Sequence, residues 1–260
     1  MRRNDSFSFD FDQFIDLVEF LRKPIREIAE FYQLAPIRAR YKSDKSPVTM
    51  ADRSIEELFR DHITTSMPMC AVIGEESGVS GRADSRYRWV IDPIDGTRSY
   101  MHGVPLYSTL IAYMEDDRPL YGAIYLPALD KMLVGDNDKA LLNGQQVCMR
   151  KCGSIAKATL LTSGMNGFFK YRDAERFIAL TRKAACFRTW GDGYGYYLLA
   201  TGRADIMVDA HTSLWDCAAV VPVIRGAGGV ISDYVGGPVT GDNGMVAASP
   251  ELHGKVVEAL

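Results

Sequence analysis

Trp-Val-Ile-Asp-Pro-Ile-Asp-Gly-Thr, residues 89–97, joins a short apolar run to two closely spaced carboxylates. The proline disfavours helical angles at the residue before it, so we expect Asp92 at the end of an extended strand. Asp95 follows on the same loop, Gly96 permits close approach of the backbone, and Thr97 can begin a helix. The free N–H groups at the start of a helix bind phosphate. Two carboxylates beside a phosphate make sense when hard cations lie between them.

Two further carboxylates stand where predicted strands end. Glu75 is the first acidic residue of a Gly-Glu-Glu-Ser segment that follows a short apolar run. Asp216 ends a Leu-Trp-Asp segment at a predicted strand-to-helix junction. Taken singly, a strand-end Glu is most often solvated and a Trp-Asp pair is most often a helix cap. Their joint occurrence indicates that they share one cation site with Asp92 and Asp95.

The composition excludes several classes of protein. The chain has 260 residues, with 30 Lys and Arg against 33 Asp and Glu, so its net charge of −3 gives no basic surface for general nucleic-acid binding. No apolar run approaches the ~20 residues that span a membrane, and the N-terminus lacks the apolar block of a secretory signal. The five cysteines match no zinc pattern, and we expect them to be reduced, mostly core residues of a cytoplasmic protein.

The spacing of apolar residues predicts different element types in the two halves of the chain. In the first half it predicts helices at 11–28 and 55–63, strands at 70–73 and 87–91, a hairpin of 107–113 with 120–126, and a turn at 143–144. In the second half, strands at 159–162, 187–190 and 206–209 alternate with helices at 173–183, 194–201 and 215–227. This alternation indicates α/β layering. We place the division at four polar residues, 136–139, which gives an N-terminal half at 1–138 and a C-terminal half at 139–260.

Together these segments resemble the inositol monophosphatase superfamily of Mg-dependent, lithium-sensitive phosphatases. The resemblance covers nearly the whole chain, through residues 47–52, the Gly-Glu-Glu-Ser and Asp-Pro-Ile-Asp-Gly-Thr segments, and the run from Gly202 through Trp215-Asp216 to Gly228-Gly229. It implies a five-layer αβαβα sandwich of the inositol monophosphatase and fructose-1,6-bisphosphatase type. It also implies a homodimer.

The resemblance implies a role for each matching residue. The implied metal ligands are oxygen donors: Glu75, Asp92, the Ile94 carbonyl, Asp95 and Asp216. They would hold two Mg²⁺ ions, with a third, weaker ion at Glu75. The implied phosphate-binding residues are Asp95, Gly96 and Thr97, and the implied catalytic residues are Glu75, Asp52 and Thr97. Asp52 would accept a hydrogen bond from the Thr97 hydroxyl and so help to orient the attacking water, and Lys42 is expected near the mouth of the metal site.

Paired Mg²⁺ ions suit the direct hydrolysis of a phosphate monoester. They bind the phosphate, lower the pKa of a water molecule and stabilise the leaving oxygen in an in-line displacement. An aspartyl-phosphate phosphatase of the haloacid-dehalogenase type needs Asp-x-Asp, whereas Asp92 and Asp95 are three apart. The chain has no Walker A sequence, so an NTPase has no support. A non-catalytic regulator that binds phosphorylated ligands is disfavoured by the complete ligand set.

Residues 190–194, Trp-Gly-Asp-Gly-Tyr, bear on the substrate. Inositol-preferring members have Gly-Ser-Ala in place of 191–193, and the pattern here resembles the histidinol-phosphatase branch, whose substrate carries an ammonium and an imidazole. A charged hydrogen bond from Asp192 to the ammonium would contribute about 1.5–3 kcal/mol. The expected substrate-binding residues are Arg98, Trp190, Asp192, Asp209 and Asp216.

Other interpretations of this segment stay open. Asp192 could instead cap the helix predicted near Tyr194, and Trp190 could belong to the core. The family pattern has Cys where this chain has Gly193, which puts the fine specificity in question. A broader inositol-phosphate or sugar-phosphate phosphatase is the main alternative to a histidinol-phosphate phosphatase. A phosphatase of 3′-phosphoadenosine-5′-phosphate has less support, because the sequence offers no adenine-binding feature.

Overall fold

The structure, a computed structural model, describes residues 9–34, 37, 39–41 and 47–260. Its larger sheet is eight-stranded in the order β10-β9-β8-β7-β6-β5-β3-β4 and is antiparallel except where β3 runs parallel to β5. The strands of this sheet are β3 (Ala71–Gly74), β4 (Gly78–Gly81), β5 (Tyr87–Asp95), β6 (Ser108–Glu115), β7 (Arg118–Leu126), β8 (Lys131–Gly135), β9 (Ala140–Leu142) and β10 (Gln145–Val147). A separate two-stranded ribbon pairs β1 (Arg40–Tyr41) with β2 (Pro47–Val48).

Two long helices, α1 (Phe11–Gln33) and α2 (Met50–Ser66), cover one face of the larger sheet. Seven apolar residues of α1 recur at helical spacing and are buried, whereas Phe20 and Phe31 are exposed. A capping box at Asp10 fixes the start of the helix. Phe14 stacks on the buried Trp89 of β5 with 5.8 Å between ring centroids. The apolar periodicity therefore drives these helices onto the sheet, as the sequence predicts.

The smaller sheet is five-stranded in the order β12-β11-β13-β15-β14. Its first three strands in that order are parallel, in agreement with the predicted strand–helix alternation, and β15 and β14 add antiparallel pairs. The strands are β11 (Thr159–Leu161), β12 (Cys186–Arg188), β13 (Ile206–Asp209), β14 (Val230–Ser232) and β15 (Met245–Ala248).

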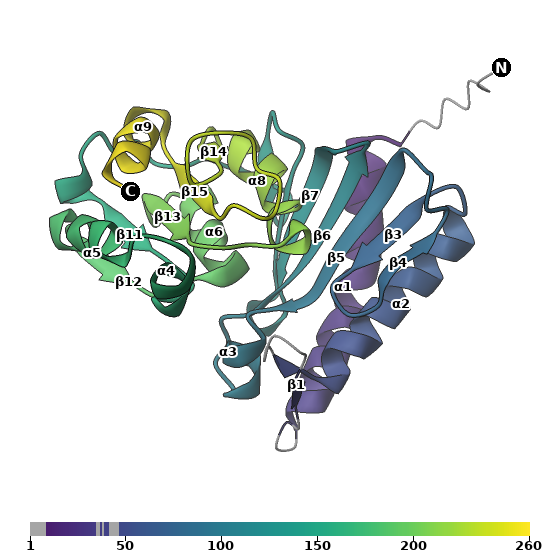
Figure 1. The fold of residues 1–260 in the computed structure, drawn as a ribbon. Coiled ribbons are helices and arrows are strands. Elements are labelled where there is room, and N and C mark those ends of the chain that lie inside the picture. Colours follow the sequence, from purple (N-terminus) through teal and green to yellow (C-terminus); the bar gives the residue numbers. More distant parts are fainter. Residues whose placement is uncertain (1–8, 35–36, 38, 42–46) are drawn as a thin grey trace.

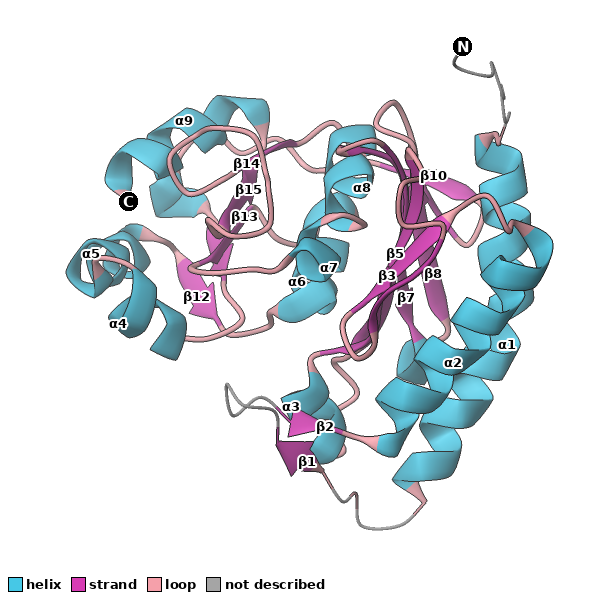
Figure 2. Ribbon diagram, turned by 45° about the vertical axis from the view of Figure 1, so that its right-hand side comes forward, coloured by secondary structure: helices cyan, strands magenta, loops and turns pink. Residues whose placement is uncertain are grey.

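The remaining helices complete the layers. Between the sheets lie α6 (Asp192–Ala200), α7 (Leu214–Cys217) and α8 (Val220–Gly226); outside the smaller sheet lie α4 (Asn166–Tyr171), α5 (Ala174–Lys183) and α9 (Pro250–Ala259). Figure 2 shows α1 and α2 on one face of the larger sheet and the middle helices against the other. The five-layer αβαβα sandwich is confirmed. A short helix, α3 (Thr97–Met101), and two 3₁₀ helices, Pro127–Leu129 and Ile155–Lys157, lie in connections.

The structure differs from the sequence prediction at the key strand. We expected the strand to end at Asp92, but β5 continues to Asp95, and its pairing with β6 is irregular between these two residues. Pro93 cannot donate a ladder hydrogen bond, so it occupies this irregular position without ending the strand. Both carboxylates therefore belong to a strand in the body of the sheet.

Other elements lay outside the sequence prediction or changed within it. The prediction did not include β4, β8, α4, α9 or the antiparallel strands of the smaller sheet, and the expected helix at 215–227 is two helices, α7 and α8. The expectation that most cysteines are in the core is wrong: Cys70 and Cys217 are buried, Cys148 is exposed, and the other two are half-buried. Within the described residues, no helix is both long and apolar enough to cross a membrane.

The predicted division at 138/139 falls inside the connection from β8 to β9. Strands β9 and β10 then complete the larger sheet, so that sheet extends to Val147. The two-half organisation stays a prediction.

Candidate active site

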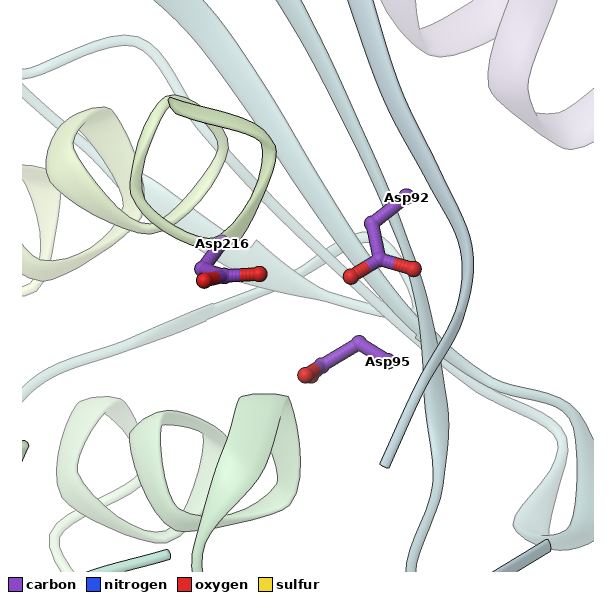
Figure 3. A group of neighbouring side chains, drawn as sticks. All are labelled: Asp92, Asp95 and Asp216. Carbon is purple, nitrogen blue, oxygen red and sulfur yellow. The ribbon is translucent and has the colours of Figure 1, made fainter. Parts of the chain in front are cut away.

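Three carboxylates from two layers of the sandwich converge (Figure 3). Asp92 and Asp95 extend from β5, and Asp216 extends from α7 toward them. One oxygen of each can be chosen so that all three lie within 4.8 Å of one another. The two β5 aspartates are buried. Asp92 Oδ1 is buried without a hydrogen-bond partner among the described residues, so it has an acceptor position to offer.

Asp95 is held by two donors from distant parts of the chain. The Ser108 hydroxyl on β6 donates to Asp95 Oδ2 over 2.7 Å, and the Gly193 N–H at the start of α6 donates to the same oxygen. A Cβ at Gly193 would overlap Ser108 Oγ and lie 2.9 Å from Asp95 Oδ2. Glycine at this position therefore lets the backbone approach the carboxylate, which gives a physical reason for the departure from the family pattern.

Asp216 is held by its own helix start. Ser213 and Asp216 form a capping box around α7, in which the Ser213 N–H donates to Asp216 Oδ2 over 2.6 Å. This leaves the other carboxylate oxygen for the cluster. The sequence interpretations of Asp216 as a helix cap and as a cation-site residue are thus compatible, because one oxygen serves each role.

Burial and mutual repulsion make the cluster costly to ionise. Burial, and then the charge of Glu75, raises the pKa of Asp92 well above its usual range. Burial raises the pKa of Asp95 to about 6, although Ser108 and Gly193 oppose the shift. Burial and the charge of Asp95 raise the pKa of Asp216 to about 8. A divalent cation would reverse these shifts, and hard carboxylate oxygens are the donors that Mg²⁺ prefers. The donor set therefore fits Mg²⁺.

Glu75 lies on the loop after β3, and a residue that the sequence analysis missed positions this loop. Glu56 on α2 is buried, and its carboxylate accepts from the N–H groups of Glu76 and Ser77 over 2.8 and 2.9 Å. It also pairs with Arg60 over 2.8 Å. The spacing of Glu56, one helical turn after Asp52, is the signal that could have found it.

The structure gives the predicted catalytic pair different partners. The Thr97 hydroxyl donates to the Ile94 carbonyl over 2.9 Å rather than to Asp52. Asp52 Oδ2 instead accepts from the N–H and hydroxyl of Thr49 in the capping box of α2. Its other oxygen is buried without a described partner. Burial raises the pKa of Asp52 to about 7, and the carboxylates of Glu76 and Glu75 act in the same direction.

Two cavities adjoin the cluster. The smaller, of about 150 Å³, is lined by Asp95, Asp216 and Gly193, and the larger, of about 610 Å³, by Glu75, Thr97 and Arg98. Both are bordered by four shared residues: Ser163, Asp192, Asp209 and His211. The larger volume lies within the roughly 300–1,000 Å³ typical of small-molecule sites.

Asp192 faces these cavities from an unusual backbone position. The capping alternative is wrong, since α6 has Gly191 as its N-cap and no side-chain cap hydrogen bond. Asp192 has φ +54°, a left-handed value that is uncommon outside glycine. Its Oδ2 would lie 2.9 Å from a Cβ at Gly96, which has φ +83° and precedes α3. Asp192 is therefore beside the expected phosphate-binding loop.

The other expected substrate residues divide into two groups. Asp209 is buried and accepts from the Ser163 N–H over 3.0 Å and the Tyr196 hydroxyl over 2.8 Å. Trp190 is not among the residues that line the two cavities; it is 43% exposed and lies 5.8 Å from the Arg188 guanidinium. The alternative that Trp190 belongs to the core is therefore wrong, and its binding role stays a prediction. Lys42 lies outside the described residues.

Comparison with known proteins identifies the family. A sequence model of the inositol monophosphatase family matches residues 12–260. The chain belongs to that family. It is 34% identical over 245 residues to a histidinol-phosphatase of Chlorobaculum parvum, covering 94% of each chain, and 29% identical to an inositol-1-monophosphatase of Mesorhizobium japonicum, covering 86% and 85%. An inositol monophosphatase structure from Zymomonas mobilis matches with a TM-score of 0.86 and 32% identity, over 97% and 99% of the two chains.

Family membership gives the converging carboxylates a chemical role. The chain is a phosphatase of the inositol monophosphatase family, a Mg-dependent family, and its acidic cluster could hold a metal ion.

Proposed function

We propose that this phosphatase hydrolyses L-histidinol phosphate to L-histidinol and phosphate, as in histidine biosynthesis. The observation that carries the proposal is the Asp192 carboxylate, which borders both cavities beside the phosphate-binding loop. Burial is the main cause that raises the pKa of Asp192, and the negative charges of Asp95 and Asp209 raise it further. An ammonium group on the substrate would supply the missing opposite charge, whereas a neutral polyol would not. The likeness to a histidinol-phosphatase supports the same conclusion.

We infer two to three Mg²⁺ ions, held by Glu75, Asp92, the Ile94 carbonyl, Asp95 and Asp216. Bound there, Mg²⁺ would stabilise the negative charge of the transition state and lower the pKa of the attacking water. The larger-sheet layer supplies most of these donors and the helix layer supplies Asp216.

The chain's own residues would bind and orient the phosphate. The backbone at Gly96 and the N–H of Thr97, at the start of α3, would donate to phosphate oxygens. Ser108 and Gly193 keep Asp95 fixed through their hydrogen bonds. Oδ1 of Asp52 has no described partner and would accept a hydrogen bond. The Thr97 hydroxyl would donate this bond if it rotated away from the Ile94 carbonyl.

The first test is phosphate release with Mg²⁺ present, measured as kcat/KM. The substrates are histidinol phosphate, inositol 1-phosphate, fructose 1,6-bisphosphate and 3′-phosphoadenosine-5′-phosphate. We expect at least a hundredfold preference for histidinol phosphate, which corresponds to roughly 2.7 kcal/mol of transition-state discrimination. A flat profile would overturn the substrate assignment and keep the phosphatase chemistry. Release from none of them would favour the non-catalytic regulator.

The second test removes the Asp192 charge. Asp192→Asn should raise KM for histidinol phosphate by roughly 10- to 100-fold, because a charged hydrogen bond is lost. The KM for inositol 1-phosphate should change much less. The control is Asp242→Asn. Asp242 is exposed, and its charge acts on Cys217, the residue after Asp216, so this variant measures the effect of removing a nearby negative charge that does not border the cavities. Equal changes in KM for both substrates would show that Asp192 does not determine specificity.

Inositol 1-phosphate is the second candidate substrate, because the Zymomonas mobilis neighbour is an inositol monophosphatase at 32% identity. The same substrate panel decides between the two. The expected homodimer and cytoplasmic location stay predictions, and light scattering of the purified chain would test the first.

A further inference from the structure

The wall of the larger cavity contains a pair of stacked rings that the expected site did not include. Tyr171 ends α4 and His211 follows β13, and both border the larger cavity. Their ring centroids are 4.4 Å apart with 21° between the planes. His211 also lines the smaller cavity, together with Asp95 and Asp216, so it is the member of the pair that borders both cavities.

Neighbouring residues hold this ring pair in place. The Arg172 guanidinium donates from Nε to the Ala210 carbonyl over 2.8 Å and from Nη2 to Asn243 Oδ1 over 2.9 Å. The end of α4 is thereby tied to the backbone beside His211. The Lys170 ammonium lies 4.5 Å from the Tyr171 ring centroid, so that ring already has two partners. Tyr171 is therefore better suited to support His211 than to meet a ligand itself.

We propose that His211, backed by Tyr171 as a positioning residue, contacts the flat ring of the substrate's leaving group. The proposal rests on the proposed function and extends it. Asp192 on α6 would recognise the ammonium, and His211 on the loop after β13 would recognise the ring. The two groups border the same cavities and come from different elements, so each recognition can be measured separately.

The test uses three phosphate esters that share a carbon chain. Histidinol phosphate carries both ammonium and ring, 2-aminopropyl phosphate keeps the ammonium and lacks the ring, and 3-phenylpropyl phosphate keeps a ring and lacks the ammonium. The readout is the ratio of kcat/KM for each ring-bearing ester to kcat/KM for 2-aminopropyl phosphate. His211→Ala should lower both ratios by about 2- to 12-fold, the loss expected for one stacked ring. His211→Phe should restore the ratio for 3-phenylpropyl phosphate.

Variants at Tyr171 test the positioning role. Tyr171→Leu should lower the same ratios, Tyr171→Phe should not, and Tyr171→Leu should add little to His211→Ala, because the two residues act as a unit. Phe169→Leu on the same helix is the matched control, since Phe169 is 64% exposed and is not among the cavity-lining residues. Its ratios should equal those of the unaltered chain.

Failure of this proposal differs from failure of the proposed function. If His211→Ala changes kcat/KM for the three esters by the same factor, or the ratios move by less than about twofold, His211 does not recognise the ring. If the unaltered chain does not prefer histidinol phosphate to inositol 1-phosphate, the proposed function fails. The effect of His211→Ala on the ratio for 3-phenylpropyl phosphate then still decides whether His211 binds the ring of an ester.

Discussion

The two sheets supply different parts of the site. In the larger sheet, Asp92 and Asp95 lie on a buried strand, and hydrogen bonds hold the second of them. Around the smaller sheet, Asp192 and His211 lie at a helix start and on a loop that border open cavities. From this comparison we propose that the buried strand serves the chemistry of every ester and that the cavity border serves the choice between esters. Variants of the first should lower turnover of every ester, and variants of the second should change ratios between esters.

The largest effect is expected for Asp95→Asn. It removes a proposed metal ligand and little volume, so kcat/KM should fall for every phosphate ester by more than the roughly 100-fold that loss of an outer-shell partner costs. The Tm without Mg²⁺ should hold or rise, because repulsion within the cluster is relieved, and the Mg²⁺-induced rise in Tm should shrink. Thermal scans with Mg²⁺ and with EDTA measure both. Near-normal activity would show that the metal assignment is wrong.

Glu56→Gln should have the next largest effect. It leaves the largely buried Arg60 without its charge partner, a change that typically costs about 3–5 kcal/mol. For a chain of this size that corresponds to a fall in Tm of about 2–4 °C per kcal/mol. Apparent Mg²⁺ affinity should weaken together with Tm, because the loop that carries Glu75 loses its anchor.

The control is Glu57→Gln, since Glu57 is the neighbouring residue on the exposed face of α2. It should change neither Tm nor Mg²⁺ affinity. If Glu56→Gln lowered Tm and left Mg²⁺ affinity unchanged, the role of Glu56 in positioning the metal site would be refuted.

Ser108→Ala removes one of the two donors to Asp95 and keeps the glycine contact. We expect a loss of about 10- to 100-fold in Mg²⁺ affinity or activity, as for other partners of metal ligands. The loss should be equal for histidinol phosphate and inositol 1-phosphate. A change in the ratio between these substrates would contradict the separation of chemistry from selectivity.

Stability should also depend on pH, and the carboxylate cluster and His253 should act in opposite directions. Without Mg²⁺, the raised pKa values of Asp95, about 6, and Asp216, about 8, mean that the folded state binds more protons than the unfolded state. This stabilisation is full below pH 3.8 and is lost as pH rises through those values. Burial lowers the pKa of His253 on α9, so its contribution is present above pH 6.5 and is lost below it.

Unfolding scans in EDTA from pH 5 to 8 measure both slopes. Asp95→Asn should flatten the fall of Tm toward high pH, and His253→Asn should reduce any loss toward low pH. Saturating Mg²⁺ should abolish the first slope and leave the second. If Tm still fell toward high pH in saturating Mg²⁺, the carboxylate cluster would not be the cause of that fall.

The sequence predicted the site where its signals are local. Asp92, Asp95 and the Trp-Asp helix start lie within short motifs, and the joint occurrence of these motifs predicted the convergence that the structure shows. The contact of Gly193 with Asp95 joins residues 98 positions apart, and no local pattern encodes it. The Tyr171–His211 stack likewise depends on how two connections meet in space. The length of β5 was underestimated because a proline normally ends a strand, and only the pairing with β6 shows that it does not here.

The left-handed backbone at Asp192 has a consequence for the descent of this enzyme. Asparagine and glycine adopt that conformation more readily than aspartate, and each is one base change away in the genetic code. Replacement of Asp192 by either residue would therefore lower the strain in the backbone. Under the proposed function, selection for the substrate is what keeps the carboxylate in place. A duplicated copy that no longer acts on this substrate should lose Asp192 early, while keeping the aspartates of β5.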